Sequence, residues 1–405
     1  MSNFSDLLDR LIREAGIEGR ELARQVPVNP GHISNMRQGK KRASLQVAER
    51  LDSILGADGR LVAAALADGL PADRPAVLAA IGAVIDPSET AELARRLRAS
   101  EVDAGTLDAL ARTTETLCTQ YAYRDPVHLR HEAQQWLSYT GRLLGHRTGL
   151  REHRELLVTA GWLTLLTACL EYDSGMAAAA EATRVSAFHL GREAGHAEIV
   201  AWSLEIAAWM AHTRHDPQAA ITYARAGQEA APRASVAVQL IAHEARSLGR
   251  LGDKRAVTAA LDRGHKLLQG VPLAANMVNH FVVDPAKFDF YAMDCLRVVG
   301  DGDRAAEHAR EVLRAGRGPD GQDISPMRMS EARIALGCVA ARRGDLDEAA
   351  AWGAEAFRAD RKCLPSLALV AGELDDEMRG RYPDARPASE FRDQLAEIRQ
   401  MLPAG

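Results

Sequence analysis

The sequence predicts an all-α protein, in which a small amino-terminal helical unit is followed by a long α-solenoid of paired helices. Three observations lead to this prediction. Alanine is frequent in many long segments, which favours helix, and no stretch alternates apolar and polar residues as a half-buried strand would. A bounded pair of helices is indicated at residues 17–42, and turn sequences recur later at the period of a paired-helix repeat.

Length and composition indicate a folded protein of two or three domains with a sizeable core, since the chain has 405 residues. The longest apolar run, residues 161–170, is about half the length needed to cross a bilayer. We therefore expect a cytoplasmic protein with no membrane partner. The cysteines are odd in number and far apart, which favours buried free thiols over a disulfide framework or a zinc site. They are Cys118, Cys169, Cys295, Cys338 and Cys363.

The first elements are expected to be a supporting helix and a helix-turn-helix. Residues 5–15 place apolar side chains on one face, which would pack behind the motif. Ala23 then stands where two helices would cross, since a larger side chain would push them apart. The positions that a helix-turn-helix has to bury are all apolar, namely Leu22, Val26, Val28, Ile33 and Met36.

The second helix of this motif has marked ends. Asn29 can cap it, because its side chain accepts a hydrogen bond from a free N–H of the first turn, and Pro30 supplies a helical φ at the first position. Gly39 suits the carboxyl-terminal end. We therefore expect a short helix over residues 30–38.

Charge in this region points to a polyanionic partner. Residues 22–48 contain no Asp or Glu, although the chain as a whole carries a net charge of −5. An all-basic stretch just beyond a bounded helix is what phosphate contact requires. The alternative is a pair of bundle helices with a solvated basic face. The basic residues are Arg24, Arg37, Lys40, Lys41 and Arg42.

Further helices complete the first domain. Ser44 is placed to cap a fourth helix that runs to Leu55, and residues 60–67 resume the apolar pattern after a break. We expect the domain to span residues 1–67. Residues 68–103 contain prolines and short apolar runs and are interpreted as a linker with short helices, one of them over residues 87–100.

The segments VNPGHISNMRQGKKR and VAERLDSILGADGRLVAAA resemble the xenobiotic-response-element (lambda-repressor-like) helix-turn-helix family of transcriptional regulators. The resemblance is closer to its actinobacterial branch, whose members carry a helical-repeat sensor domain. It implies that the second helix enters the major groove of an operator. The implied contacts are His32 and Asn35 on base edges, Asn29 and Arg37 near the backbone, Gly31 at a position that often reads bases, and Lys40, Lys41 and Arg42 on phosphates.

The motif departs from the family pattern at two places. Pro27 stands where a turn glycine is usual, and proline cannot adopt a positive φ, so the turn must differ locally. Pro30 and Gly31 replace side chains that often read bases. Specificity is then expected to depend on His32, Asn35 and the shape of the DNA.

Repeats predict the architecture of residues 104–382. Helices are interrupted by turn sequences at 172–175, 215–217, Gly252-Asp253, Gly302-Asp303 and Gly344-Asp345. Their spacing is close to that of tetratricopeptide repeats, and GDRAAEHAREVLRAG and GDLDEAAAWGAEAFRAD resemble the second helix of that repeat. A helix pair cannot bury its apolar face alone, so the pairs should stack into a right-handed solenoid.

One interval of the repeat is too long. The extra residues between the two successive turns lie near residues 270–289. Insertions in solenoids tend to lie on one face, often the binding face. After the last repeat, residues 365–382 and 387–402 are expected to form a helix pair with a polar outer side, so that residues 383–405 act as a carboxyl-terminal cap.

The inner groove of the solenoid is where a ligand would be held. Aromatic side chains could bury an apolar part of a peptide or small molecule, and amides and imidazoles could bond its polar groups. The alternative is that these residues are simply core. The candidates are Trp162, Trp202, Glu205, Trp209, His212, His243, Arg246, Asn276, Asn279, His280 and Phe288.

Other motifs do not indicate catalysis. Residues 316–321 match GxGxxG, but they follow a helix and contain proline, so they are interpreted as a loop. Two histidine groups have no evident further metal ligand and are expected to be solvated. We expect no enzyme, no cofactor and no metal site. The histidine groups are His128, His131 and Glu132, and His212, His215 and Asp216.

Taken together, these patterns favour a homodimeric, ligand-responsive transcriptional regulator that binds a double-stranded DNA operator and holds a peptide or small-molecule effector in the repeat groove. One alternative is an interaction adaptor whose solenoid docks a partner protein and whose DNA contact serves localisation only. A weaker alternative is an enzyme with a helical active-site groove.

Overall fold

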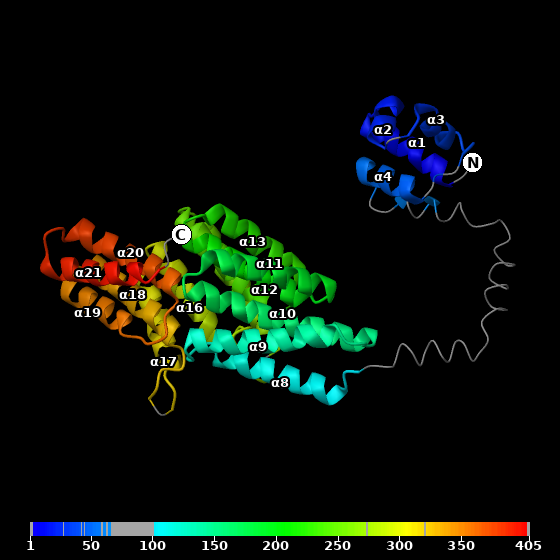
Figure 1. The fold of residues 1–405 in the computed structure, drawn as a ribbon. Helices are drawn as coiled ribbons and strands as arrows, with labels where there is room; N and C mark the ends of the chain where they lie inside the picture. The colour runs from blue at the N-terminus through cyan, green and yellow to red at the C-terminus, as the bar shows by residue number, and fades with distance from the viewer. Residues whose placement is uncertain are drawn as a thin grey trace. The chain divides into compact units, whose positions relative to one another are not determined.

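The computed structural model describes residues 3–26, 28–41, 43, 45–57, 60–61, 64–65, 101–272, 274–319 and 321–402. The chain divides into two compact units, residues 1–96 and 97–405 (Figure 1). Every described element is a helix apart from one isolated bridge between Arg317 and Asp323, which confirms the all-α class. The expectations for Pro27, Arg42, Ser44 and the linker over residues 68–100 lie outside the described residues.

The first unit is a small bundle around the helix-turn-helix. Its helices are α1 (Asn3–Ala15), α2 (Gly19–Gln25), α3 (Pro30–Arg37) and α4 (Leu45–Leu55). The motif positions are buried as expected, with Val28 half-buried at the edge of the core and Leu22, Ala23, Val26, Ile33 and Met36 at its centre. Apolar side chains of α1 and α4 complete this core, which fixes the angle at which α3 crosses α2.

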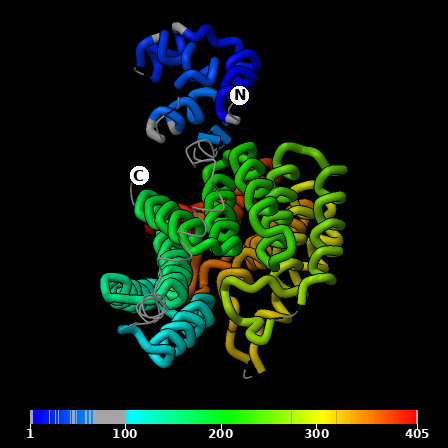
Figure 2. Tube along the Cα trace, turned by 90° about the vertical axis from the view of Figure 1, so that its right-hand side faces the viewer, coloured from blue at the N-terminus to red at the C-terminus, as the bar shows by residue number. Residues whose placement is uncertain are grey.

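The second unit is a solenoid with an inner and an outer layer of helices (Figures 1 and 2). It opens with α8 (Ala104–Gln120) and α9 (Pro126–Leu144). The inner helices, each packed on the next, are α10 (Leu150–Asp173), α12 (Ala197–Thr213), α14 (Ser235–Arg250), α16 (Pro285–Val298), α18 (Pro326–Arg343) and α20 (Leu364–Arg381). The outer helices are α11 (Ala177–Glu193), α13 (Pro217–Ala230), α15 (Lys254–Gly270), α17 (Gly302–Ala315), α19 (Leu346–Phe357) and α21 (Arg386–Gln400).

Small residues let the outer helices approach the inner ones closely. A Cβ added to Gly227 of α13 would lie 2.7 Å from a Leu240 methyl carbon of α14, so that position has room only for hydrogen. The outer helices are rich in alanine for the same reason: their small alanine side chains face the inner layer and allow the close approach. The fully buried alanines of the outer helices are Ala180, Ala187, Ala220, Ala224, Ala260, Ala305, Ala309, Ala349, Ala356 and Ala388.

The turns that follow α12, α14, α16 and α18 share one device. A residue with positive φ ends the inner helix, and an aspartate follows whose carboxylate caps the outer helix, as at Gly252 and Asp253. His215 adopts the same positive φ before Asp216. The turn expected at Gly302-Asp303 is wrong by two positions: Gly300 has the positive φ and Asp301 is the cap, so residues 302 and 303 already lie in α17.

The insertion between α15 and α16 is anchored to α8. Asn276 and Asn279 donate hydrogen bonds to the Glu115 carboxylate at 2.6 and 2.7 Å, and the backbone N–H of His280 donates to the Cys118 carbonyl at 3.1 Å. The His280 ring lies on Tyr121, with the ring centroids 3.7 Å apart. The insertion therefore spans from the middle of the solenoid back to its first helix.

The carboxyl-terminal helix pair is more than a cap. Helix α20 packs not only on α18 but also on α10 and α12, and Figure 2 shows this orange segment running between the two sides of the unit. Trp209 donates to the Ser366 hydroxyl at 2.8 Å, and Arg361 forms a buried ion pair with Asp173. These contacts close the inner layer on itself, so that it surrounds an interior space.

Candidate functional site

The exposed face of α3 is a candidate nucleic-acid interface. Gly31 and Asn35 are exposed on it, and His32 is half-buried. Ser34 on α3 and Gln38 directly after its end are also exposed. Sequence reasoning did not single them out, although Gly31, Ser34 and Gln38 recur at helical spacing. The exposed residues lie opposite the buried Ile33 and Met36, and His32 lies at the boundary between the two faces, so the core fixes which face α3 presents.

The ends of α3 are capped as the sequence indicated. The Asn29 side chain accepts a hydrogen bond from the Gly31 N–H at 2.9 Å, so its one side-chain oxygen is already used in holding the helix. At the other end Gly39 has a φ of +69°, and the Lys40 and Lys41 N–H groups donate to the Asn35 carbonyl at 2.8 and 3.2 Å. The two lysines are thus fixed directly beyond the helix.

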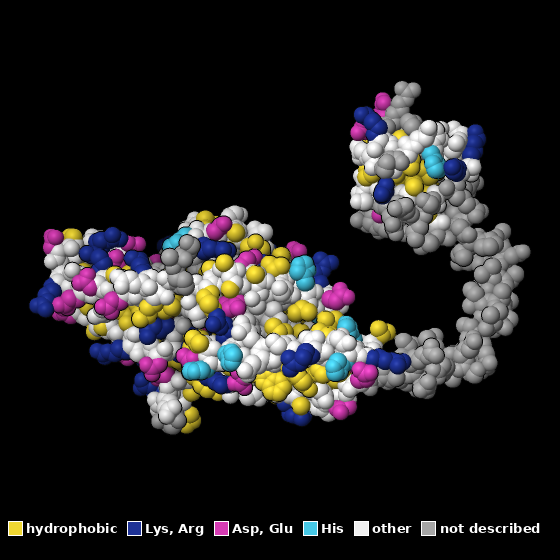
Figure 3. Space-filling model, viewed as in Figure 1, with side chains coloured by type: hydrophobic (Ala, Val, Ile, Leu, Met, Phe, Trp, Pro, Cys, Tyr) yellow, Lys and Arg dark blue, Asp and Glu magenta, His cyan; other side chains and the backbone are white. Residues whose placement is uncertain are grey.

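The basic residues of this unit do not all carry free charge. Arg37 is ion-paired with Asp9 of α1, whose pKa is lowered chiefly by the hydrogen bond from Arg37. Arg24 is paired with Glu21, which lies just outside the acid-free stretch. Lys40 and Lys41 are exposed and have no ion-pair partner among the described residues. Basic side chains and a histidine are visible on this unit in Figure 3.

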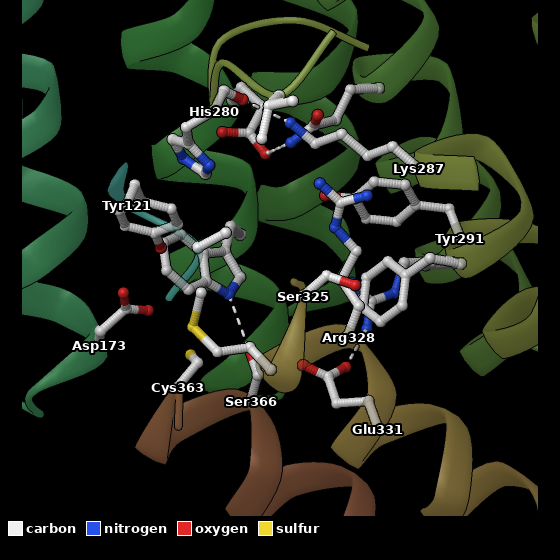
Figure 4. Close-up of a pocket in the computed structure, with 18 residues that line it drawn as sticks. Tyr121, Asp173, His280, Lys287, Tyr291, Ser325, Arg328, Glu331, Cys363 and Ser366 are labelled. Atoms are coloured by element: carbon white, nitrogen blue, oxygen red, sulfur yellow. Dashed lines mark hydrogen bonds and ion pairs between the residues drawn. The ribbon is translucent and has the colours of Figure 1, made fainter. Parts of the chain in front are cut away.

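The second candidate site is the interior space of the solenoid (Figure 4). It is a cavity of about 100 Å³ whose walls come from every inner helix and from the insertion. Asp173, Cys363 and Ser366 lie on one side of it, and Lys287 and Tyr291 lie on the other. Val278, whose side chain is exposed, belongs to its rim.

The structure brings only some of the sequence candidates to this cavity. Glu205, Trp209, Arg246 and His280 line it. Trp162 and Asn279 line a separate depression next to α8. Asn276 anchors the insertion, and the remaining candidates are buried, namely Trp202, His212, His243 and Phe288. The expectation that His212 is solvated is wrong, because it is 2% exposed, and burial lowers its pKa well below the ordinary value.

Residues that sequence reasoning missed supply much of the cavity's chemistry. Lys287 and Arg328 are cationic, Tyr121 and Tyr291 are aromatic walls with hydroxyl groups, and Glu331 is a buried acid. One signal was available: Lys287 stands among apolar residues in the segment PAKFDF, and the chain has only six lysines. A lysine on an otherwise apolar helix face is unusual, because burying its charge is costly.

An arginine network lies beside the cavity and is balanced by acids. Arg246 bonds Asp294 at 2.7 Å, and Arg250 bonds both Asp294 and Glu373, at 3.1 and 2.9 Å. Glu331 lies 3.9 Å from Arg246, and burial raises its pKa to about 7. Deeper in the wall, His243 and Gln239 share one oxygen of Glu205. These bonds hold the side chains of the inner helices in fixed orientations.

Comparison with known proteins assigns the first unit. A protein-family model described as a helix-turn-helix domain matches residues 3–65. No curated protein matches the chain. Among the described residues, no helix is long and apolar enough to span a membrane, and no group of three or more His, Cys, Asp or Glu is arranged to hold a metal ion. The first unit is thus a helix-turn-helix domain, which supports a DNA-binding regulator.

Proposed function

We propose that the protein is a sequence-specific transcriptional regulator that binds an operator through α3 and responds to an effector held in the cavity of its tetratricopeptide-like unit. The observation that carries the proposal is the pairing, in one chain, of a helix-turn-helix domain with a helical-repeat unit that encloses a polar cavity. In this proposal the cavity binds the ligand and does not catalyse a reaction on it.

Operator contact is proposed to divide between two kinds of residue. Asn35 and His32, with Ser34 and Gln38 beside them, face the base edges in the major groove, and Lys40 and Lys41 bind phosphates. Arg37 serves mainly to fix α3 against α1 through its Asp9 ion pair. Few charges are therefore left for phosphate contact, which favours a homodimer on two half-sites over a monomer.

The closure of the solenoid offers a means of response. The contacts of α20 with α10 and α12 surround the cavity, so a ligand inside it touches both ends of the inner layer at once. A ligand that binds better when α20 is docked shifts the population toward that curvature. In a dimer, a change in curvature alters the spacing of the two recognition helices, and half-sites about one helical turn apart tolerate little change.

The proposal is tested by selecting genomic DNA fragments with the purified full-length protein at physiological salt and sequencing what is bound. We expect a pseudo-palindromic site to be enriched. Asn35→Ala should lose the sequence preference and keep much of the non-specific affinity. Absence of enrichment by the wild-type protein would favour the adaptor, whose solenoid docks a partner protein.

A further inference from the structure

Two cations that face the cavity have no acidic partner in an ion pair among the residues that the structure describes. The Lys287 side chain is 4% exposed, and its ammonium donates to the His280 carbonyl at 2.7 Å and approaches the Val282 carbonyl at 3.4 Å. It lies over the Trp202 ring, 5.0 Å from the centroid. Arg328, half-buried on α18, has no hydrogen bond or ion pair within the described part of the chain. Both side chains line the cavity (Figure 4).

The two cations are close enough to repel each other. Burial lowers the pKa of Lys287 to about 7, and the charge of Arg328 is the next largest cause. Two other charges of the cavity wall are paired, Asp173 with Arg361 and Arg246 with Asp294. Glu331, a further acid of the wall, lies 3.9 Å from Arg246, and burial raises its pKa to about 7, so it is largely neutral at lower pH. Glu205 is the one cavity carboxylate that favours the charged form of Lys287. Below pH 7, with Lys287 protonated and Glu331 largely neutral, the cavity thus has one more cation than Glu205 can balance.

The same cavity contains buried acceptors without donors. One carboxylate oxygen of Asp173 and the amide oxygen of Gln239 are buried and accept no hydrogen bond from any described residue. An unmet buried acceptor destabilises the folded state, so a native protein rarely retains one without a use. Each would accept an N–H or O–H group from a ligand that reaches it.

Size and wall chemistry limit what can enter. The cavity of about 100 Å³ is smaller than an engineered protein cavity of roughly 150 Å³ that binds benzene. The walls between the polar groups are Trp209, Tyr121 and Tyr291, which suit a few carbon atoms. An extended peptide cannot fit inside, although the last residue of one could.

We propose that the cavity binds a small organic carboxylate, with its carboxylate group between Lys287 and Arg328 and with an N–H or O–H group donating to Asp173 or Gln239. This inference rests on the proposed function, because it names the effector class of that same cavity. The carboxylate belongs either to a free small molecule, such as an amino acid or hydroxy acid, or to the carboxyl-terminal residue of a peptide.

Binding should depend on pH in a defined direction. A bound anion favours the protonated form of Lys287, so binding takes up a proton above pH 7 and the affinity falls as pH rises. Glu331 titrates near pH 7 as well and becomes an anion in the cavity at higher pH, which acts in the same direction.

The other groups that act electrostatically on Lys287 are Glu205 on α12, Asp284 at the start of α16, Cys169 on α10 and Arg328 on α18. Burial raises the pKa of Cys169 well above its ordinary value, so this thiol stays neutral between pH 6 and 8. Burial likewise lowers the pKa of the neighbouring His280 well below its ordinary value, so its ring is neutral over the same range.

The test is calorimetric titration of the full-length protein at pH 6 and pH 8. One set of probes is the free L-amino acids and small α-hydroxy acids, each compared with its amide. A second set is Gly-Gly-Xaa tripeptides with free or amidated carboxyl termini. We expect at least one free carboxylate to bind, its amide not to bind, and the affinity to be higher at pH 6. Whichever set binds identifies the source of the carboxylate.

Arg328→Gln should weaken binding of that carboxylate by about 10- to 100-fold, the loss of one charged hydrogen bond. Arg328→Lys should restore part of it. Arg343→Gln, which removes an exposed arginine paired with Asp303 outside the cavity, is the matched control and should bind as the wild type does. Because Arg328 is half-buried, has no ion pair among the described residues and repels Lys287, its replacement should not lower the melting temperature, which separates binding from folding.

Failure of this inference and failure of the proposed function give different results. If no free carboxylate binds in either set, or if Arg328→Gln binds as tightly as the wild type, the carboxylate site is wrong even where DNA selection succeeds. If a carboxylate binds as expected but never changes the affinity for the selected DNA, the site stands and its role as an effector site is wrong.

Discussion

Lys287→Met should stabilise the repeat unit, and by an amount that depends on pH. Lys287 is buried, and its pKa falls from 10.5 to about 7 on folding. Below pH 7 the side chain is charged in both states, so the folded state bears the full cost of burying the charge. Above pH 7 it is neutral in the folded state while the unfolded chain still binds the proton, so the stability of the wild type rises with pH up to about 10.5.

The two pKa values set the size of the effect. At pH 6.5 the buried ammonium costs about 4 to 5 kcal/mol, and at pH 9.5 the remaining cost is about 1 to 2 kcal/mol. Methionine removes this cost and leaves the His280 and Val282 carbonyls without a donor, a loss of about 1 to 3 kcal/mol that does not vary with pH. The advantage of Lys287→Met over the wild type should therefore shrink by about 3 kcal/mol between the two pH values.

The assay is urea unfolding of the full-length protein, followed by circular dichroism at pH 6.5 and pH 9.5. Lys266→Met makes the same chemical change at an exposed position and is the control, for which we expect no comparable pH dependence. An equal difference between Lys287→Met and the wild type at both pH values would refute the reasoning. The reasoning would also be refuted if the stability of Lys287→Met minus that of the wild type were lower at pH 6.5 than at pH 9.5.

Three further changes test other parts of the structure. Lys40→Ala should weaken operator and random DNA about equally and reduce the slope of log affinity against log salt by about 1 per protomer, measured by fluorescence anisotropy; an unchanged slope would show that Lys40 does not contact phosphate. Gly252→Ala should cost about 1 kcal/mol because its φ is +82° with open space around it, whereas Gly380→Ala in the exposed face of α20 should be neutral or stabilising; urea midpoints decide, and equal effects would contradict the turn argument. Arg361→Met leaves a buried carboxylate unpaired and should cost about 3 to 5 kcal/mol in the same assay; a change below about 1 kcal/mol would mean that the link between α20 and α10 contributes little.

The sequence was sufficient for most of the fold because the fold is local. The helix-turn-helix core, the Asn29 cap and the glycine-aspartate turns depend on neighbouring residues, and the positions named from spacing are those that the structure buries or caps. The error at Gly302-Asp303 has a simple origin. Two glycine-aspartate pairs occur in succession, and only the φ at Gly300 shows which of them ends the helix.

The interior site depended on contacts between residues far apart in the chain, which spacing does not reveal. The contact of Trp209 with Ser366 joins residues 157 positions apart, and the ion pair of Arg361 with Asp173 joins residues 188 apart. Without this closure there was no reason to place Lys287 and Arg328 in one cavity. Spacing also did not reveal that one basic residue of the first unit is already paired, because the ion pair of Arg37 with Asp9 joins α3 to α1.

The coupling between the cavity and α3 is the central claim, and one measurement addresses it most directly. The dissociation constant of the full-length protein for its selected operator would be measured with the cavity empty and with it saturated by the best-binding carboxylate. We predict a change of at least about fivefold, with the operator changing the affinity for the carboxylate by the same factor, and no change for Arg328→Gln at the same carboxylate concentration. Identical dissociation constants for the wild type with and without the carboxylate would contradict the account.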